Sequence, residues 1–265
     1  MKRYASHFFD QQNRRRILMT DPIYAIGDVH GQLEKLLEVI ARIEADGGPT
    51  ANIVFLGDLV DRGPDSSGVI ELVINARQLE KNWQVVKGNH DRMFQYFMED
   101  TPRHDTRLRA ELSWMHPRLG GRETLASYGV DVHPDRTERD IHAEARAKVS
   151  QSHMAFIENL PFFHQVGHLL FVHAGIRPGI ALPKQSEDDL CWIRDDFLND
   201  PRQHPWLVVH GHTVVPAVEH RGNRVNLDTG AGYGNPISAA VFEGDQVWRL
   251  GPNGRELLIP AAIQI

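Results

Sequence analysis

The sequence predicts an α/β protein with two packed mixed β-sheets flanked by helices. At the front of the chain, short apolar runs rich in β-branched and aromatic residues alternate with helical stretches, the pattern of βαβ units and a parallel sheet. Towards the end of the chain, strand signals follow one another with short turns between them, which favours antiparallel pairing. Two sheets packed face to face accommodate both patterns.

Apolar runs at residues 23–26, 53–56 and 83–86 are expected to form buried strands. Between the first two, apolar residues recur at three- and four-residue steps, which predicts an amphipathic helix over 33–43. A second crossover helix is expected to begin near Val69 and to end shortly before the third strand. These connections place the polar loops after the strands at the carboxyl edge of a parallel sheet, where open α/β sheets bind ligands.

From residue 92 to about residue 160 the pattern changes to helical segments broken by proline and glycine, which predicts a helical insertion. Strand signals return at 169–172 and 206–209, and they continue at 224–227, 238–243 and 246–250. Gly244 and Asp245 separate the last two runs and predict a β-hairpin.

Composition and charge are those of an ordinary globular protein. The 265 residues contain no low-complexity linker, so we expect one domain over 21–265. With 29 basic and 35 acidic residues, a net charge of −6 and 41% hydrophobic content, a nucleic-acid partner is not expected. The single Cys191 cannot form an internal disulfide, and no apolar run approaches the ~18 residues that span a bilayer. A cytoplasmic location without a membrane partner is therefore predicted.

Residues 1–20 are basic but contain no apolar stretch behind a charged start, so a secretory signal is not expected. We interpret them as a disordered extension, or as a segment translated from upstream of Met19, which would itself be a suitable start. The alternative is a basic tail that contacts phosphates.

Five polar loops end apolar strands: GDVHG at 27–31, GDLVDRG at 57–63, GNHD at 88–91, HAG at 173–175 and HGHT at 210–213. One such loop would indicate only a turn. Together they offer oxygen and nitrogen donors suited to divalent metals, namely Asp28, His30, Asp58, Asn89, His173 and His212. This number fits two ions that share a carboxylate, and Asp58, central in the series, is predicted to be the bridge.

The five ordered motifs resemble those of the phosphoprotein-phosphatase family of dinuclear metallophosphoesterases, particularly its bacterial and phage members. The resemblance runs from Ile23 to about Leu250, and the stretches WMHPRLGGRETLASYG at 114–129 and CWIRDDF at 191–197 also look like bacterial members. It implies a calcineurin-like fold with two metal ions. It further implies that the first metal is held by Asp28 and His30, that Asp58 bridges, and that the second is held by Asn89, His173 and His212.

The same resemblance implies hydrolysis of a phosphoester by a hydroxide that bridges the two metals. His90 resembles the family's general acid, and Asp61 would orient it by accepting a hydrogen bond from its other ring nitrogen. Arg62 and Arg194, together with Asn89, match positions that bind the substrate phosphate.

Several residues in or near these motifs have alternative interpretations. For Arg194 the alternative is a surface salt bridge with one of the two aspartates that follow it. Asp228 either supports a ligand histidine or forms an ordinary turn. His210 precedes the matching histidine and is not expected to be a ligand. Cys191 does not belong to a Cys-x5-Arg loop because Phe occupies position 197, so a buried thiol is expected.

Two positions give opposite indications of the substrate. Asp61 favours the protein-phosphatase branch, whereas Asp91, after the catalytic histidine, resembles the symmetrical diadenosine tetraphosphate hydrolases. Since Asp61 belongs to the proton-delivery pair, the leading prediction is a serine/threonine phosphoprotein phosphatase that also accepts small aryl phosphates. The alternatives are a symmetrical diadenosine tetraphosphate hydrolase and a non-catalytic protein that binds phosphorylated ligands.

The predicted cofactor is a pair of divalent metal ions. Mn²⁺ is favoured, and Fe, Zn or Co would accept the same mixture of Asp, Asn and His ligands. The predicted partner is a phosphorylated protein or a small phosphoester, and the motifs do not specify an oligomeric state.

Overall fold

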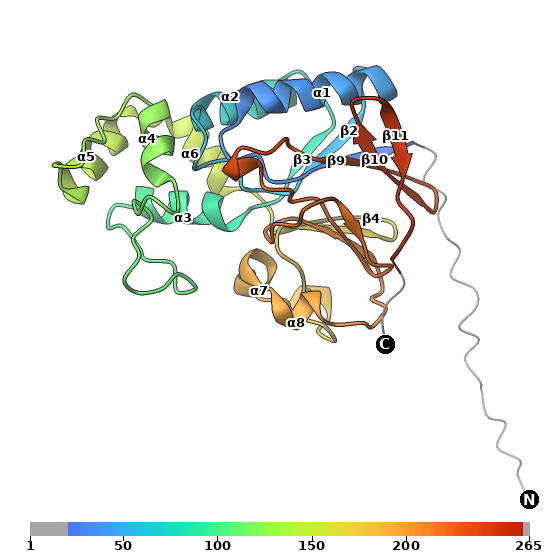
Figure 1. The fold of residues 1–265 in the computed structure, drawn as a ribbon. Coiled ribbons are helices and arrows are strands. Elements are labelled where there is room, and N and C mark those ends of the chain that lie inside the picture. The colour runs from blue at the N-terminus through green and yellow to red at the C-terminus, as the bar shows by residue number, and fades with distance from the viewer. Residues whose placement is uncertain (1–20, 262–265) are drawn as a thin grey trace, which may run out of the picture.

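The computed structural model describes residues 21–261. The predicted extension over residues 1–20 lies outside the described residues, as do residues 262–265. Two β-sheets are stacked between two layers of helices (Figure 1). The α/β class and the two mixed sheets predicted from the sequence are therefore confirmed.

The first sheet has the strand order β11-β10-β9-β1-β2-β3. The three strands from the front of the chain are parallel, and β9 pairs antiparallel with β1 and carries the predicted hairpin with β10. The bounds are β1 Ile23–Ile26, β2 Asn52–Phe55, β3 Trp83–Val85, β9 Ala239–Glu243, β10 Gln246–Gly251 and β11 Gly254–Leu257.

The second sheet has the order β4-β5-β6-β8-β7. Its three central strands are parallel, and an antiparallel strand closes each edge. The bounds are β4 Phe163–Val166, β5 Leu169–Val172, β6 Leu207–His210, β7 Glu219–His220 and β8 Arg224–Asn226.

Helices α1 (Leu33–Gly47) and α2 (Ser66–Gln78) lie along the outer face of the first sheet, and α7 (Glu187–Trp192) and α8 (Asp195–Leu198) lie on the far side of the second (Figure 1). The α2 helix begins before Val69 because the Asp65 carboxylate caps it, accepting from Gly68 N at 2.8 Å. Two 3₁₀ turns, η1 (Leu182–Lys184) and η2 (Ala231–Tyr233), lie in loops.

The predicted insertion is helical and gathers at one end of the sheets (Figure 1). It contains α4 (Gly121–Ser127), α5 (Glu138–Lys148) and α6 (Gln151–Glu158). The helix before them, α3 (Asn89–Met98), begins inside the GNHD motif rather than after it. Within the described residues, no helix has the length and apolar character that crossing a membrane requires.

Alternation along the strands builds the layers. In β1, Tyr24 and Ile26 pack with the core under α1 and α2, whereas Ile23 and Ala25 pack between the two sheets. Because successive side chains of a strand point to opposite faces, a strand buried on both faces reads as a continuous apolar run. This is why the sequence showed β1 clearly. A third cluster lies between the second sheet and α7 and α8.

Strands β4, β7 and β11 were not predicted. β4 has the sequence FHQV with exposed and half-buried positions in alternation, and β11 begins with glycine and has only half-buried and exposed positions. Both lie at a sheet edge, where one face is open to solvent, so neither needs the apolar run that marks a central strand.

The five polar loops all follow parallel strands, and the two sheets bring them together. His30 N donates to Asp58 O at 2.8 Å between the loops after β1 and β2, and Gly211 N donates to His173 O at 2.8 Å between the loops after β5 and β6. The His173 ring then crosses between the sheets, its Nδ1 donating to Leu56 O at 2.8 Å. The carboxyl edges of both sheets therefore meet at one place.

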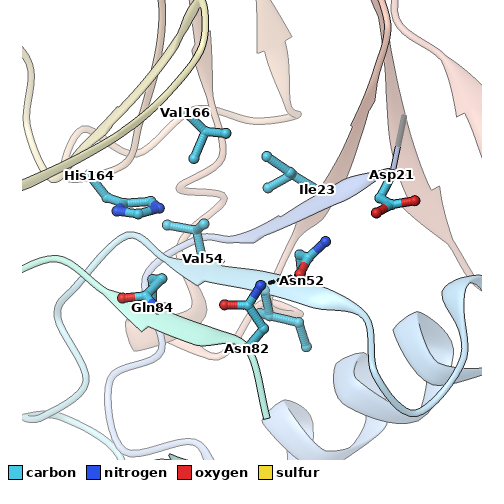
Figure 2. Close-up of a pocket in the computed structure, with 9 residues that line it drawn as sticks. Asp21, Ile23, Asn52, Val54, Asn82, Gln84, His164 and Val166 are labelled. Atoms are coloured by element: carbon cyan, nitrogen blue, oxygen red, sulfur yellow. Dashed lines mark hydrogen bonds between the residues drawn. The ribbon is translucent and has the colours of Figure 1, made fainter. Parts of the chain in front are cut away.

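A cavity of about 250 Å³ lies at the opposite edge, by the amino ends of β1, β2 and β3 (Figure 2). Its lining includes Asn52, Asn82, Gln84 and His164. It contains none of the predicted site residues, so the expected chemistry lies away from it.

The contact between the sheets should be a major source of stability. Phe171 is fully buried there, with its ring edge-on to Phe242 at 5.9 Å between centroids. We expect Phe171→Ala to lower the free energy of unfolding by about 3–5 kcal/mol, because the cavity left behind adds to the lost transfer energy. Phe163→Ala, on the partly exposed β4, is the matched control and should cost much less. Guanidinium unfolding measures the free energy of unfolding of both variants. Equal losses would contradict the claim that the contact between the sheets is a major source of stability.

Candidate metal centre

The loops at the carboxyl edges have strained backbones. Six described residues other than glycine have positive φ, and five of them lie in the motif loops: His30, Asp58, Asp61, Arg62 and His212, with φ between 50° and 74°. Residues with a Cβ adopt this region at a cost, and such strain persists where the surrounding structure enforces it. Its concentration here indicates that these loops are shaped for a site.

Three predicted ligands and the predicted bridge converge on one side of this site. Ligand atoms of Asp58, His173 and His212 lie within 4.8 Å of one another, in a group that could hold a metal ion. The Asn89 amide oxygen joins them, 2.9 Å from His173 Nε2 and 2.8 Å from His212 Nδ1. The structure thus gathers the set that the sequence assigned to the second metal.

The chemistry of this donor set fits a cation. Since His173 Nδ1 donates to Leu56 O, its Nε2 carries a lone pair, and that lone pair faces the Asn89 oxygen, another acceptor. Burial lowers the pKa of His173 to about 3 and also lowers that of His212, so both rings are neutral. His212 Nε2 is buried without a hydrogen-bond partner.

The second group consists of His30, Asp58 and His90, with ligand atoms again within 4.8 Å of one another. His30 Nδ1 donates to Val60 O at 2.9 Å, which leaves a lone pair on its Nε2. That nitrogen accepts from Arg62 Nη1 at 2.6 Å. A positive charge already lies among these ligands, and a metal bound to His30 would have to displace it.

Asp28, predicted to hold the first metal with His30, is in neither group, and its carboxylate accepts from His212 N at 3.2 Å. Burial, and then the charges of Asp228 and Asp58, raise its pKa well above the ordinary value. Burial also raises the pKa of Asp58, with Asp91 as the next cause. Such buried carboxylates are stable in their ionised form only with cations near them.

His90 and Asp61 form a close polar pair within the site. His90 Nδ1 donates to Asp61 Oδ2 at 2.6 Å, while His90 Nε2 accepts from Arg62 Nη2 at 3.0 Å. Burial lowers the pKa of His90, and the Arg62 charge adds to this. Burial raises the pKa of Asp61 to about 7, opposed by hydrogen bonds from Thr124 and Trp114. The hydrogen bond predicted between His90 and Asp61 is therefore present in the structure.

Asp91 does not face the site. It is fully buried, and its carboxylate accepts from Gly88 N, Asp58 N and Leu59 N, each at 2.9 Å. These bonds cap α3 and hold the GNHD loop against the GDLVDRG loop. Its identity therefore acts on substrate choice only through the position of these loops.

Contacts in the structure bear on the residues that had alternative interpretations. Arg194 Nη1 donates to Thr213 Oγ1 at 3.0 Å beside the GHT motif, and Asp196, a suggested salt-bridge partner, pairs with Arg177 instead. After burial, the Arg194 charge is among the causes that lower the pKa of the predicted ligands His173 and His212.

Asp228 forms a turn, its Oδ1 accepting from Gly230 N at 2.9 Å. The His210 ring contacts Gly211 O and Arg224 and belongs to neither metal group. Cys191 is buried, and burial raises its thiol pKa, as expected for an inert thiol.

Sequence reasoning missed the contact of Trp114 with Asp61, and Tyr233 also lies next to a predicted site residue. Trp114 Nε1 donates to Asp61 Oδ2 at 2.8 Å, although 53 residues separate them. Tyr233 is 66% exposed at the rim, with the Arg62 guanidinium 4.7 Å from its ring centroid. The stretch 114–129 had been noted for its resemblance to bacterial relatives, which was the available signal for Trp114.

A two-sheet α/β fold that gathers Asp, Asn and His ligands at the meeting carboxyl edges defines a metallophosphoesterase-type hydrolase. The family described as calcineurin-like phosphoesterase matches residues 21–242, and the chain belongs to it.

Curated relatives are similar along most of their length. The chain is 27% identical over 247 residues to the bis(5'-nucleosyl)-tetraphosphatase PrpE (asymmetrical) of Halalkalibacterium halodurans, covering 82% of this chain and 88% of that protein. It is 25% identical over 241 residues to the protein of the same name in Oceanobacillus iheyensis, covering 82% and 87%. The name designates asymmetrical enzymes, which differ from the symmetrical hydrolase considered above.

Two solved structures share the fold. One, provisionally described as a diadenosine tetraphosphatase, has a TM-score of 0.58 and 21% identity and covers 92% of this chain and 96% of its own. The cold-active protein-tyrosine phosphatase of a psychrophilic Shewanella has a TM-score of 0.57 and 16% identity, with 91% and 81% covered. At these identities the likeness concerns the fold alone.

Metal binding should be measurable as stabilisation. Because a cation that binds only the folded state stabilises it, we expect Mn²⁺ to raise the thermal midpoint and a chelator to reverse the rise. The rise should largely disappear in His173→Ala and persist in the control His210→Ala, whose buried ring lies outside the donor set. The contradicting outcome is that Mn²⁺ raises the thermal midpoint of neither the wild type nor the variants. The Asn89 amide would then be turned with its nitrogen toward the two histidine rings, donating to both without a cation.

Proposed function

We propose that this chain is a two-metal phosphomonoester hydrolase in which His90 is the general acid, and that its substrates are phosphoserine or phosphothreonine in proteins. The hydrogen bond of 2.6 Å between His90 and Asp61 carries this proposal. A histidine oriented by a carboxylate in this way is suited to donate a proton to the leaving oxygen of the substrate.

The benefit of a general acid depends on the leaving group. The alkoxide of a serine or threonine side chain is a poor leaving group, so a proton delivered as the P–O bond breaks lowers the barrier substantially. A nucleotide phosphate released from a polyphosphate chain is already stable as an anion and gains less from a proton. An intact acid pair therefore favours a phosphomonoester over a polyphosphate.

Two arginines supply the phosphate contacts. Arg62 and Arg194 both direct positive charge at the site, Arg62 through bonds to His30 and His90, and Arg194 from beside Thr213. The Arg62 fork is suited to exchange its histidine partners for phosphate oxygens, because a guanidinium offers paired donors in one plane. Its buried Nε has no partner and is a further donor of the same group.

The proposed metal ligands are Asp28, His30 and the bridging Asp58 on one side, and Asp58, Asn89, His173 and His212 on the other. When bound, the two cations would activate the attacking water and neutralise charge on the phosphoryl group. The chain itself fixes the ring orientations, through Val60 O for His30 and Leu56 O for His173. It also binds the phosphate and delivers the proton from His90.

A second candidate is asymmetrical hydrolysis of bis(5'-nucleosyl) tetraphosphates. The names of the relatives at 27% and 25% identity favour it. The exposed Tyr233 ring beside Arg62 would suit a nucleobase, since aromatic faces stack on bases. The symmetrical hydrolase does not match these names.

The acid role predicts a specific defect in His90→Asn. We expect kcat for a phosphothreonine peptide to fall by about 10²–10⁴-fold, the usual contribution of a positioned general acid. Metal content should be unchanged, because His90 is not among the proposed ligands. Elemental analysis beside steady-state kinetics checks both points. Loss of metal in this variant would instead make His90 a ligand.

The substrate class can be decided with one panel. Metal-loaded protein is offered p-nitrophenyl phosphate, a phosphothreonine peptide and diadenosine tetraphosphate, with Asp58→Asn as the metal-deficient control. We expect the peptide to have a higher kcat/KM than the tetraphosphate. A preference for the tetraphosphate by orders of magnitude, with ATP and AMP as products, would establish the second candidate. Inactivity towards all three would contradict both.

A further inference from the structure

The segment from Trp114 to Thr124 contacts the Asp61 carboxylate. The proposed function assigns this segment no role. Trp114 Nε1 donates to Asp61 Oδ2 at 2.8 Å, and Thr124 Oγ1 donates to Asp61 Oδ1 at 2.7 Å. Oδ2 is the oxygen that also accepts from His90 Nδ1. Both carboxylate oxygens are therefore fixed from the side of the helical insertion, while the histidine occupies the side facing the site.

The same segment holds the backbone of this loop. Asp61 N donates to Thr124 Oγ1 at 2.8 Å, and Arg62 N donates to Gly120 O at 3.3 Å. Asp61 and Arg62 have φ of 74° and 69°, which needs such support. A Cβ at Gly120 would lie 2.2 Å from Arg62 N, so only glycine permits this approach.

The segment is itself immobilised by packing. Trp114 is 6% exposed, and its ring lies 5.5 Å from that of Phe94 and 4.8 Å from that of Phe97, both on α3. A Cβ at Gly121 would meet the indole at 2.6 Å. Because α3 also begins with Asn89 and His90, the indole connects the position of Asp61 to that of the helix that carries the acid.

We propose that Trp114 and Thr124 are positioning residues for proton delivery: they hold Asp61 in the one orientation that directs His90 Nε2 at the leaving oxygen. They have no hydrogen bond to a proposed metal ligand and act through Asp61 alone. This inference rests on the proposed function, because it requires His90 to be the acid. It assigns a catalytic purpose to part of the insertion.

A positioning role has a consequence that a merely structural role lacks. Loss of a well-placed acid slows the departure of a poor leaving group more than that of a good one. Phenyl phosphate and p-nitrophenyl phosphate differ only in a nitro group, and p-nitrophenolate leaves more readily without a proton. The ratio of kcat for p-nitrophenyl phosphate to kcat for phenyl phosphate therefore reports on acid delivery, whereas a general loss of structure lowers both values together.

The experiment measures this ratio in metal-loaded wild type and variants. Trp114→Phe removes the indole N–H and keeps a ring, and Thr124→Val removes the hydroxyl and keeps the shape. We expect each to raise the ratio about tenfold, a part of the ~10²–10⁴-fold contributed by an acid. Thr124→Ser restores the hydroxyl and should return the ratio to near the wild-type value. Trp83→Phe, a buried indole in β3, is the control and should leave the ratio unchanged.

His90→Asn in the same series separates failure of this inference from failure of the proposed function. If His90→Asn raises the ratio but Trp114→Phe and Thr124→Val slow both substrates equally, the positioning role is overturned and the acid stands. If His90→Asn leaves the ratio unchanged, the acid role fails and this inference fails with it.

A second readout needs no turnover. The His90 Nδ1 proton, shared with Asp61 across 2.6 Å, should give a downfield proton resonance in metal-free protein. We expect it to shift or broaden in Trp114→Phe and Thr124→Val and to be retained in Thr124→Ser. If the resonance is unchanged in both Trp114→Phe and Thr124→Val, the proposal is overturned. This outcome can be read from variants that are too inactive for kinetics.

Discussion

The carboxylate of Asp91 holds the candidate site together. It accepts three backbone N–H groups, two from the loop after β2 and one from the loop after β3. Burial raises its pKa to about 6, and the backbone bonds oppose that rise. Asp58 lies in one of the two joined loops and Asn89 and His90 in the other. Together with the bond from His90 N to Asp58 Oδ1 at 2.9 Å, this side chain therefore fixes the positions of Asp58, Asn89 and His90 relative to one another.

Around Asp91, the site gathers buried carboxylates, and burial disfavours their negative charge. Burial is the main cause of a raised pKa at Asp28, Asp58 and Asp61 alike. Arg62 compensates part of this charge and is turned inward onto His30 and His90. A divalent ion supplies far more compensation than one guanidinium, which explains in electrostatic terms why this arrangement should bind metal and release Arg62 towards the phosphate.

The sequence predicted the elements that depend on local patterns. Strands β1, β2 and β5 were found because they are buried on both faces and read as apolar runs. The loops after them were expected to converge, because carboxyl ends of parallel strands share an edge, and the structure brings together Asp58, Asn89, His173 and His212. The edge strands β4 and β11 were not found, because strands with exposed positions lack a continuous apolar run.

Apart from the bond between His90 and Asp61, which the family resemblance implied, long-range polar contacts were beyond sequence reasoning. Nothing local to Trp114 indicates that its indole donates to a carboxylate 53 residues away. Asp91 was interpreted as a guide to substrate class, yet its contacts are with backbone N–H groups. The inward turn of Arg62 depends on a left-handed backbone and on the close approach of Gly120, which only folding creates.

The central claim is that two metal ions occupy the joined loops and share Asp58. Crystals grown with Mn²⁺ and measured at its absorption edge would test it most directly. The account predicts two anomalous peaks about 3.5–4 Å apart, one contacted by His30 and one by Asn89, His173 and His212, with Asp58 touching both. A single peak, or peaks away from Asp58, would contradict it.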